Sequence, residues 1–366
     1  MKQMKLMMMA ALCALTFTAC DDDENDYTWT PQPTDTEYYI LNQGNYSSGI
    51  DGTLSSMSYN GTYTDGIFKT ANEGMSLGNT PQNAVAYGSH LYFAVSGDQT
   101  GGYALFVADR TTRKVQKKIT MFMPRDLVAY EGKVYVSGFG ETAGNGTVAR
   151  IDTTTFETVK TPVGSYPEEL VAANGYLYVT NSGYMKGETV SKVNLKTFKE
   201  EKQIKVGLNP TRIAADAMGN VFVVTTGNYA TIPAAIQKIA IKDDAVTPVA
   251  EATQIAVHGT TLYALNSITN WTLGTTVNTY FTVNTVTGSI QKETLKTTQE
   301  DQMPKYPTNI FVSPWNGHIF VPADNDESGY ANWSGKGYLY EYDAKGVFVK
   351  KTNVGVHPVR VVFNMK

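Results

Sequence analysis

Cysteine is nearly absent from this chain of 366 residues. The only two cysteines, Cys13 and Cys20, both lie within the first 20 residues. A disulfide framework is therefore excluded as the source of stability for the remainder of the chain. Histidine is almost as scarce, with 4 residues, so few candidates exist for a metal centre built on imidazole ligands.

Charged residues are also few, at 17% of the chain, and the lysines are scattered rather than clustered. The formal net charge is −4, so the sequence has no basic patch of the kind that binds nucleic acid. No long segment has the sustained periodicity of an amphipathic helix. Glycine, with 32 residues, and tyrosine, with 23, are abundant, a balance typical of an all-β protein with many turns.

The first 19 residues have the pattern of a secretory signal peptide: two lysines, an apolar run from Leu6, and the small residues Thr18 and Ala19. The apolar run is too short to span a membrane. Cys20 follows at once, in a pattern that resembles the lipobox of bacterial lipoproteins, with Phe17 where leucine is more usual. We therefore expect cleavage before Cys20 and its acylation; an ordinary signal followed by a free cysteine is the alternative.

The sequence after Cys20, DDDEND, is acidic, and the residues from there to 36 are polar with two prolines, which predicts a linker. The acidic run resembles the export signal that sends lipoproteins of Bacteroidota to the outer face of the outer membrane; a merely soluble tether is the alternative. Removal of residues 1–19 changes the formal net charge from −4 to −6. We predict a signal peptide at 1–19, an acylated tether at 20–36 and one folded domain at 37–366.

A proline followed two or three residues later by an apolar stretch recurs along the rest of the chain. Alanine takes the place of the proline in one copy. The copies begin at Pro81, Pro124, Pro167, Pro210, Ala252, Pro307 and Pro358, and their starts are separated by 43, 43, 43, 42, 55 and 51 residues. Spacing of this regularity indicates a repeat protein.

Each complete copy continues with three further strand-like runs, as in GYLYVTNSG followed by ETVSKVNLKTFKEEKQIKVG. Four strands in a meander over about 40–45 residues form one blade of a β-propeller. The seventh copy stops after its first strand, and the three missing strands match the segment that begins EYYILNQGN at Glu37. We therefore predict an all-β, seven-bladed propeller whose ring closes by pairing N- and C-terminal strands in one blade.

Residues Tyr178 to Asn181 read YVTN, and the chain resembles the YVTN-repeat propellers over nearly all of residues 37–366. With its lipobox, its acidic tether and the segment EYYILNQGNYSSGIDGTLSSMSY, it looks like the surface propeller lipoproteins of Bacteroidota. Some members of that group capture cobamides on top of a TonB-dependent outer-membrane transporter. The resemblance implies a cell-surface protein, held to the outer membrane by its lipid and monomeric by itself, that passes a small molecule, a corrinoid among the candidates, to such a transporter.

In a propeller, the loop after the second strand of each blade lies on the same face as the segment that leads into the proline. Every such loop here carries an aromatic residue, including the predicted loop NSITNWTLGTT at residues 266–276. The aromatic residues are Tyr46, Tyr103, Phe139, Tyr184, Tyr229, Trp271, Tyr330 and Trp333. We predict that they form a wide apolar binding surface, because exposed rings are otherwise costly; for any one ring, capping of the gap between two blades is the alternative.

Polar residues follow most of the prolines, near the expected mouth of the central channel. The pairs are Gln82 and Asn83, Arg125 and Asp126, Glu168 and Glu169, Thr211 and Arg212, Thr308 and Asn309, and Val359 and Arg360. Since side chains alternate along a strand, one member of each pair should reach the channel and the other should pair between blades. We include Arg125, Glu168, Arg212 and His357 among the predicted ligand-binding residues, in a mouth that suits a large ligand with amide groups and apolar faces.

Residues for catalysis or metal binding do not converge in the sequence. His90, His258 and His318 fall at turns on the opposite face, in different blades. The acidic loop from Asp324 begins like a calcium loop but has Gly335 where the closing glutamate should stand. No nucleophile elbow or phosphate-binding loop is present, so we predict a non-catalytic protein without metal or cofactor.

Three hypotheses for the function remain. Capture of a nutrient for a transporter is favoured by the export signal and the aromatic face. An enzyme resembling the propeller lactonases would need Glu168, Glu169 or Asp126 as its acid or base, although carboxylates at a propeller mouth are usually in salt bridges. Adhesion, or the binding of a glycan or siderophore, would use the same aromatic face and differ only in the ligand.

Overall fold

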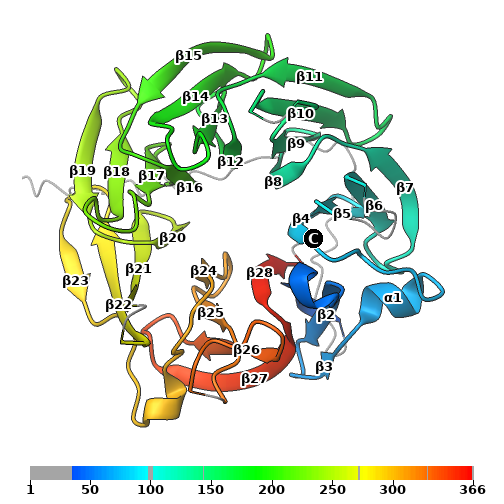
Figure 1. Ribbon diagram of the computed structural model, residues 1–366, viewed down its shortest axis with the longest axis vertical. Helices are drawn as coiled ribbons and strands as arrows, with labels where there is room; N and C mark the ends of the chain where they lie inside the picture. The colour runs from blue at the N-terminus through cyan, green and yellow to red at the C-terminus, as the bar shows by residue number, and fades with distance from the viewer. Residues whose placement is uncertain (1–34, 98–101, 143, 271–272, 328, 365–366) are drawn as a thin grey trace, which may run out of the picture. The chain divides into compact units, whose positions relative to one another are not determined.

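The computed structural model describes residues 35–97, 102–142, 144–270, 273–327 and 329–364. Within these ranges the chain forms seven four-stranded antiparallel sheets, arranged as blades around a common axis (Figure 1). The predicted seven-bladed propeller is therefore confirmed. No helix in the described ranges is long and apolar enough to cross a membrane.

The four strands of each blade occupy equivalent places in every sheet. The innermost strands are β4 (Pro81–Tyr87), β8 (Pro124–Tyr130), β12 (Pro167–Ala173), β16 (Pro210–Ala215), β20 (Gln254–His258), β24 (Phe311–Val312) and β28 (Pro358–Phe363). The second strands are β5 (His90–Val95), β9 (Lys133–Gly138), β13 (Tyr176–Asn181), β17 (Val221–Thr225), β21 (Thr261–Asn270), β25 (Ile319–Ala323) and β1 (Thr36–Asn42).

The outer half of each blade completes the meander. The third strands are β6 (Ala104–Asp109), β10 (Thr147–Asp152), β14 (Thr189–Asn194), β18 (Ala235–Ile239), β22 (Thr275–Asn284), β26 (Lys336–Tyr342) and β2 (Thr53–Ser58). The outermost strands are β7 (Val115–Thr120), β11 (Thr158–Pro162), β15 (Lys199–Lys205), β19 (Val246–Ala250), β23 (Ile290–Lys292), β27 (Phe348–Val356) and β3 (Tyr63–Thr64). The short helix α1 (Ile67–Ala71) and the 3-10 turns η1 (Tyr46–Ser48) and η2 (Glu300–Gln302) lie in connecting segments.

The core consists of apolar layers between neighbouring blades. The second and third strands, such as β5 (HLYFAV) and β6 (ALFVAD), are buried along almost their whole length because a blade packs against each of their faces. Tyr92 and Val107 of one blade, for example, pack with Leu127 and Ile151 of the next. The outermost strands, such as β7 (VQKKIT), are largely exposed and polar, which explains why the repeat is clearest at the inner strands.

The ring closes through a blade built from both ends of the described chain. Strand β28 pairs antiparallel with β1, with Ile40 opposite Val361 and Leu41 opposite Arg360. The sheet order is β28-β1-β2-β3, so the predicted closure is confirmed. Strand β28 thus covers the edge of β1 that would otherwise be open to pairing with another chain.

The segment predicted as the loop NSITNWTLGTT is largely strand in the structure. Asn266 to Asn270 continue β21 and pair with the first half of β22, so both strands are 10 residues long. The β-branched side chains of Ile268 and Val277, which face each other across the two strands, favour this conformation. The resulting long hairpin forms one wall of the candidate site.

Candidate functional site

Two cavities meet where the innermost strands begin. The outer cavity, of about 830 Å³, is bordered by the loops after β9, β13 and β17 and by the hairpin β21–β22. The inner cavity, of about 600 Å³, is bordered by the first residues of β4, β8, β12, β16 and β28 and by those that precede β24. Arg125, Glu168 and Arg212 border both cavities, so the two form one continuous candidate site.

The structure brings together about half of the predicted ligand-binding residues. Those on the outer cavity are Arg125, Phe139, Glu168, Tyr184, Arg212 and Tyr229, and His357 borders the inner cavity. Those that border neither of these two cavities are Tyr46, Tyr103, Tyr330 and Trp333. Trp271 and Cys20 lie outside the described residues.

Two tyrosines of adjacent blades present their rings to the outer cavity. Tyr184 and Tyr229 are 70% and 72% exposed. Both have left-handed backbones, with φ of 52° and 56°. This conformation costs a residue with a side chain about 1–2 kcal/mol. Strained positions of this kind are concentrated at binding and active sites.

A row of side chains in contact connects Tyr184 to Arg125, which borders the inner cavity. The ring of Tyr166 lies 5.4 Å from that of Tyr184 and 5.0 Å from that of Phe139. The guanidinium of Arg125 lies over Phe139, 5.0 Å from the ring centre. Aromatic contacts at these distances fix the rings relative to one another, so this side of the cavity is a preformed surface.

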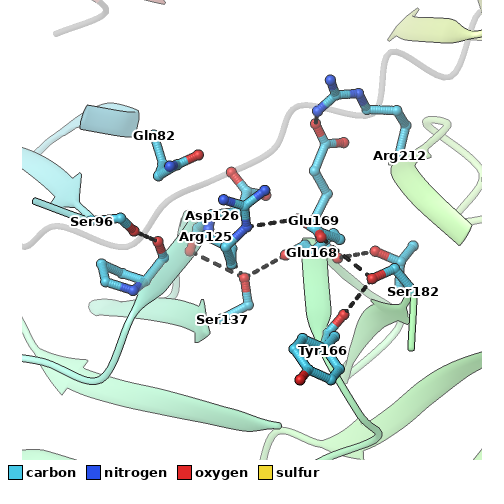
Figure 2. Close-up of polar contacts among 12 residues, drawn as sticks. Gln82, Ser96, Arg125, Asp126, Ser137, Tyr166, Glu168, Glu169, Ser182 and Arg212 are labelled. Carbon is cyan, nitrogen blue, oxygen red and sulfur yellow. Dashed lines mark hydrogen bonds and ion pairs between the residues drawn. The ribbon is translucent and has the colours of Figure 1, made fainter. Parts of the chain in front are cut away.

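Ion pairs join neighbouring blades at the mouth of the inner cavity (Figure 2). Nε of Arg125 donates to Oε2 of Glu168 at 2.8 Å. Nη1 of Arg212 donates to Oε1 of Glu169 at 2.7 Å. The other oxygen of Glu169 accepts from the backbone N–H of Ile213 at 3.1 Å. Each carboxylate therefore already has a cationic partner.

Asp126 is one of two buried carboxylates that border the inner cavity. One of its oxygens accepts from the Asn83 amide, and the other accepts from the backbone N–H of Leu170 at 3.1 Å. Burial raises the pKa of Asp126 to about 6, with a further contribution from the negative charge of Glu169, against which Arg360 acts. Asp126 thus has a pKa close to neutral pH although it is hydrogen-bonded.

The alternation expected after the prolines is present at three of the six pairs, whereas both members are partly exposed in the other three. Asn83, Asp126 and Asn309, the second members of their pairs, are buried, whereas the first members Gln82 and Arg125 are partly exposed. The bonds of Asn83 and Asp126 cross from blade to blade. Asn83 and Asp126 therefore stabilise the contact between blades as well as bordering the inner cavity.

Sequence reasoning missed several polar and apolar residues that border the outer cavity. Oγ1 of Thr211 and Oε1 of Gln254 are buried there and have no hydrogen-bond partner among the described residues. Ile268 of the long hairpin is 57% exposed and borders the same cavity. Gln254 could have been found in the sequence, since Ala252 occupies the place of a proline and Gln254 follows it by two residues.

Metal-binding residues are not clustered in the part of the chain that the structure describes, where no group of three or more His, Cys, Asp or Glu side chains could hold an ion. Nδ1 of His357 lies 2.7 Å from Oδ1 of the buried Asp324 at the inner cavity. The acidic loop that begins at Asp324 thus contributes a partner for His357 to the site.

The chain resembles other propellers of known structure. A quinonprotein alcohol dehydrogenase-like protein from Bacteroides thetaiotaomicron shares 15% identity at a TM-score of 0.59, over 90% of this chain and 78% of that one. The periplasmic gluconolactonase of Pseudomonas aeruginosa shares 12% identity at a TM-score of 0.57, over 88% of this chain and 98% of that one. Likeness at such low identity supports the fold alone.

A family model matches the chain, although no curated protein does. No curated protein has significant sequence similarity to the chain. The family model of the domain of unknown function DUF5074 matches residues 36–364, which include all seven blades. The chain therefore belongs to the DUF5074 family.

Proposed function

We propose that this protein is a non-catalytic binding protein of the cell surface that captures a small molecule in its outer cavity for a TonB-dependent outer-membrane transporter. The observation that carries the proposal is the outer cavity with Tyr184 and Tyr229, two strained and highly exposed rings on one side. A ligand that covers the exposed apolar faces of these rings would remove a large area from water.

The size and chemistry of the site favour a large ligand with both apolar and polar faces. A volume of about 830 Å³ lies in the upper part of the range of about 300–1,000 Å³ that is common for small-molecule sites. The outer cavity is lined by aromatic rings and by the side chain of Ile268, together with the polar residues Thr211 and Gln254. A cobamide, with amide groups around a flat macrocycle, is the ligand that we name first.

A hydrolase or lactonase is the less favoured candidate. Glu168 and Glu169 are in ion pairs, and both oxygens of Asp126 already accept hydrogen bonds. The pKa of about 6 at Asp126 is the one feature that favours an acid or base there. A glycan or a siderophore would occupy the same cavity as a cobamide and is the alternative ligand class.

The cell-surface location and the transporter partner rest on the sequence of residues 1–36, with the predicted lipid on Cys20. Within the proposal, the lipid is the link to the outer membrane and the propeller acts as a monomer. Mass spectrometry of the mature protein tests this part, because acylation adds the mass of the fatty acids to a chain that begins at Cys20.

Calorimetric titration of the purified protein with cobalamin and with cobinamide tests the ligand. We expect saturable binding with a Kd of about 1 μM or lower. Tyr229→Ala should weaken it about tenfold or more, because the exposed ring contributes contact area in the outer cavity.

The matched control is Tyr46→Ala. Tyr46 is a loop tyrosine with similar exposure, 73%, but it borders neither cavity, so its removal should leave the affinity unchanged. Absence of heat with both compounds would remove the cobamide from the proposal. Equal effects of the two substitutions would contradict the assignment of the site to the outer cavity.

A further inference from the structure

Seven side chains, one from each blade, occupy the second position after the proline or its substitute. They are Asn83, Asp126, Glu169, Arg212, Gln254, Asn309 and Arg360. All of them border the inner or the outer cavity. Because they recur at equivalent places in the blades, they form a ring of polar groups at the start of the innermost strands.

One arc of this ring is saturated with hydrogen bonds. The Asn83 amide donates to Asp126, and Arg212 forms its ion pair with Glu169 at 2.7 Å. The remaining oxygens of Asp126 and Glu169 accept from backbone N–H groups of the next blade, each at 3.1 Å. This arc has little capacity left for a ligand.

The opposite arc is not saturated. Asn309 is only 8% exposed, and its Oδ1 accepts from the backbone N–H of Ile310 at 2.9 Å. That bond fixes the orientation of the amide, so that its NH2 group has no hydrogen-bond acceptor among the described residues. Because Asn309 borders the inner cavity, a group bound there can supply the acceptor that the chain does not provide.

Arg360, the next member of the ring, also has donors without an acceptor among the described residues. Its guanidinium lies over the ring of Phe311, 5.2 Å from the ring centre, and borders the inner cavity. It has no hydrogen bond or ion pair in the described part of the chain, unlike Arg125 and Arg212 at the same mouth. Asn309 and Arg360 together therefore offer unpaired donors, two from the amide and up to five from the guanidinium.

We propose that Arg360 and Asn309 form a subsite that binds an anionic oxygen group of the ligand, a carboxylate or a phosphate. The planar guanidinium matches two oxygens of such a group, and the Asn309 amide adds a third donor from the adjacent blade. This inference rests on the proposed function in that the group belongs to the captured ligand. It assigns the polar end of that ligand to the inner cavity and its apolar part to the outer cavity.

The charges around the inner cavity determine how the subsite depends on pH. The charged or titratable groups that border it are Arg125, Asp126, Glu168, Glu169, Arg212, Asp324, His357 and Arg360. Ion pairs and the contact of His357 with Asp324 involve six of them, which leaves Arg360 and Asp126. Arg360 lowers the pKa of Asp126, which burial and Glu169 raise to about 6.

A bound anion would offset the charge of Arg360 and so raise the pKa of Asp126 further. Binding is then accompanied by uptake of a proton, and the affinity for the anion is highest below pH 6 and falls as the pH rises through this value. Asp126→Asn should remove this dependence, because the side chain at this position no longer titrates.

The experiment is an NMR titration that follows the side-chain Nε–H signals of arginine in the purified protein. Sodium acetate and sodium phosphate are added separately, and sodium chloride at equal ionic strength is the reference. We expect a saturable shift of the Arg360 signal with acetate, phosphate or both, and the stronger of the two identifies the group. The Arg360 signal is assigned by its loss in Arg360→Lys.

Two substitutions test the donors. Arg360→Gln should abolish the saturable response that the other signals near the cavity show. Asn309→Asp keeps the oxygen that accepts from Ile310 but replaces the NH2 group with a negative oxygen, so the affinity should fall about tenfold or more. Circular dichroism of each variant establishes that it is folded.

The proposal is overturned if acetate and phosphate shift the Arg360 signal no more than chloride does, or if saturable binding survives in Arg360→Gln. Neither result depends on cobalamin. Failure of the cobalamin titration with a positive acetate or phosphate response would remove the cobamide and retain the subsite, and the reverse combination would retain capture and remove the subsite.

Discussion

At the scale of single residues, Asp126 combines structural and electrostatic roles. It joins three blades through Asn83, its own strand and Leu170, in a position from which water is nearly excluded. A pKa raised from 3.8 to about 6 corresponds to roughly 3 kcal/mol against the ionised form. Above pH 6 the Asp126 carboxylate is ionised in the folded protein, and this buried charge lowers the free energy of unfolding.

The pH dependence of unfolding tests this cost. Between pH 4 and pH 6 the native state holds a proton on Asp126 that the unfolded state has lost, so stability falls as the pH rises through this window and is level above it. Asp126→Asn lacks this term. We expect the free energy of unfolding of the variant, relative to the original protein, to rise by up to ~3 kcal/mol from pH 4 to pH 7 in urea titrations; parallel pH profiles would contradict the raised pKa.

Tyr229 has an unfavourable left-handed backbone conformation and a side chain that is mostly exposed. Asparagine tolerates a left-handed backbone better than tyrosine does. We expect Tyr229→Asn to raise the free energy of unfolding by up to ~1 kcal/mol while it weakens cobalamin binding in calorimetry. Tyr46→Asn should give neither effect, since Tyr46 is not among the residues with a left-handed φ. Loss of stability in Tyr229→Asn would show that the ring packs against the protein.

At the scale of elements, the long hairpin β21–β22 distinguishes one blade from the others. One face of its extension is held against the neighbouring blade, where Nδ2 of Asn278 donates to the carbonyls of Pro304 and Lys305 at 3.1 and 2.9 Å. The other face carries the exposed pair Ile268 and Val277. A wall supported from behind and apolar in front suits the apolar part of a ligand.

Substitution of Ile268 tests this wall. Ile268→Asn should weaken cobalamin binding several-fold, because it removes apolar surface from the outer cavity, and should change the melting temperature little, because the side chain is mostly exposed. The matched control is Val286→Asn in the turn between β22 and β23, where a similarly exposed side chain lies away from both cavities. Equal affinities of the two variants would remove the hairpin from the site.

The elements that the sequence predicted well are those set by short repeated patterns. Prolines at regular spacing and buried second strands such as YLYVTN specify a blade, because each blade packs in the same way against its neighbours. Loop conformation does not follow such a pattern. Tyr184 and Tyr46 occupy equivalent loops of different blades, but Tyr184 has a left-handed backbone and borders the outer cavity, whereas Tyr46 begins a 3-10 turn and borders neither cavity. The hairpin was missed because its strands continue through a segment rich in turn-forming Asn and Gly.

At the scale of the whole molecule, stability depends on closure of the ring. Strand β28 supplies the hydrogen bonds to one edge of β1 and buries Val361 and Val362. Burial of two valines alone contributes about 3–6 kcal/mol, comparable to the net stability of many domains. The strand that closes the ring also supplies Arg360 to the inner cavity, so formation of the cavity depends on closure.

A truncated chain tests the closure. Removal of residues 358–366 should prevent stable folding or lower the melting temperature steeply, and the exposed edges should cause self-association, measured by circular dichroism and size-exclusion chromatography. A variant lacking only residues 365 and 366 is the control and should melt like the full chain. Unchanged melting of the longer truncation would contradict the role assigned to β28.

The most direct test of ligand capture is a crystal structure of the protein grown with cobalamin. We expect electron density for the ligand in the outer cavity, against the rings of Tyr184 and Tyr229 and the hairpin residue Ile268, with a polar group directed to Arg360. Density on another face, or crystals that contain no ligand at saturating cobalamin, would contradict it.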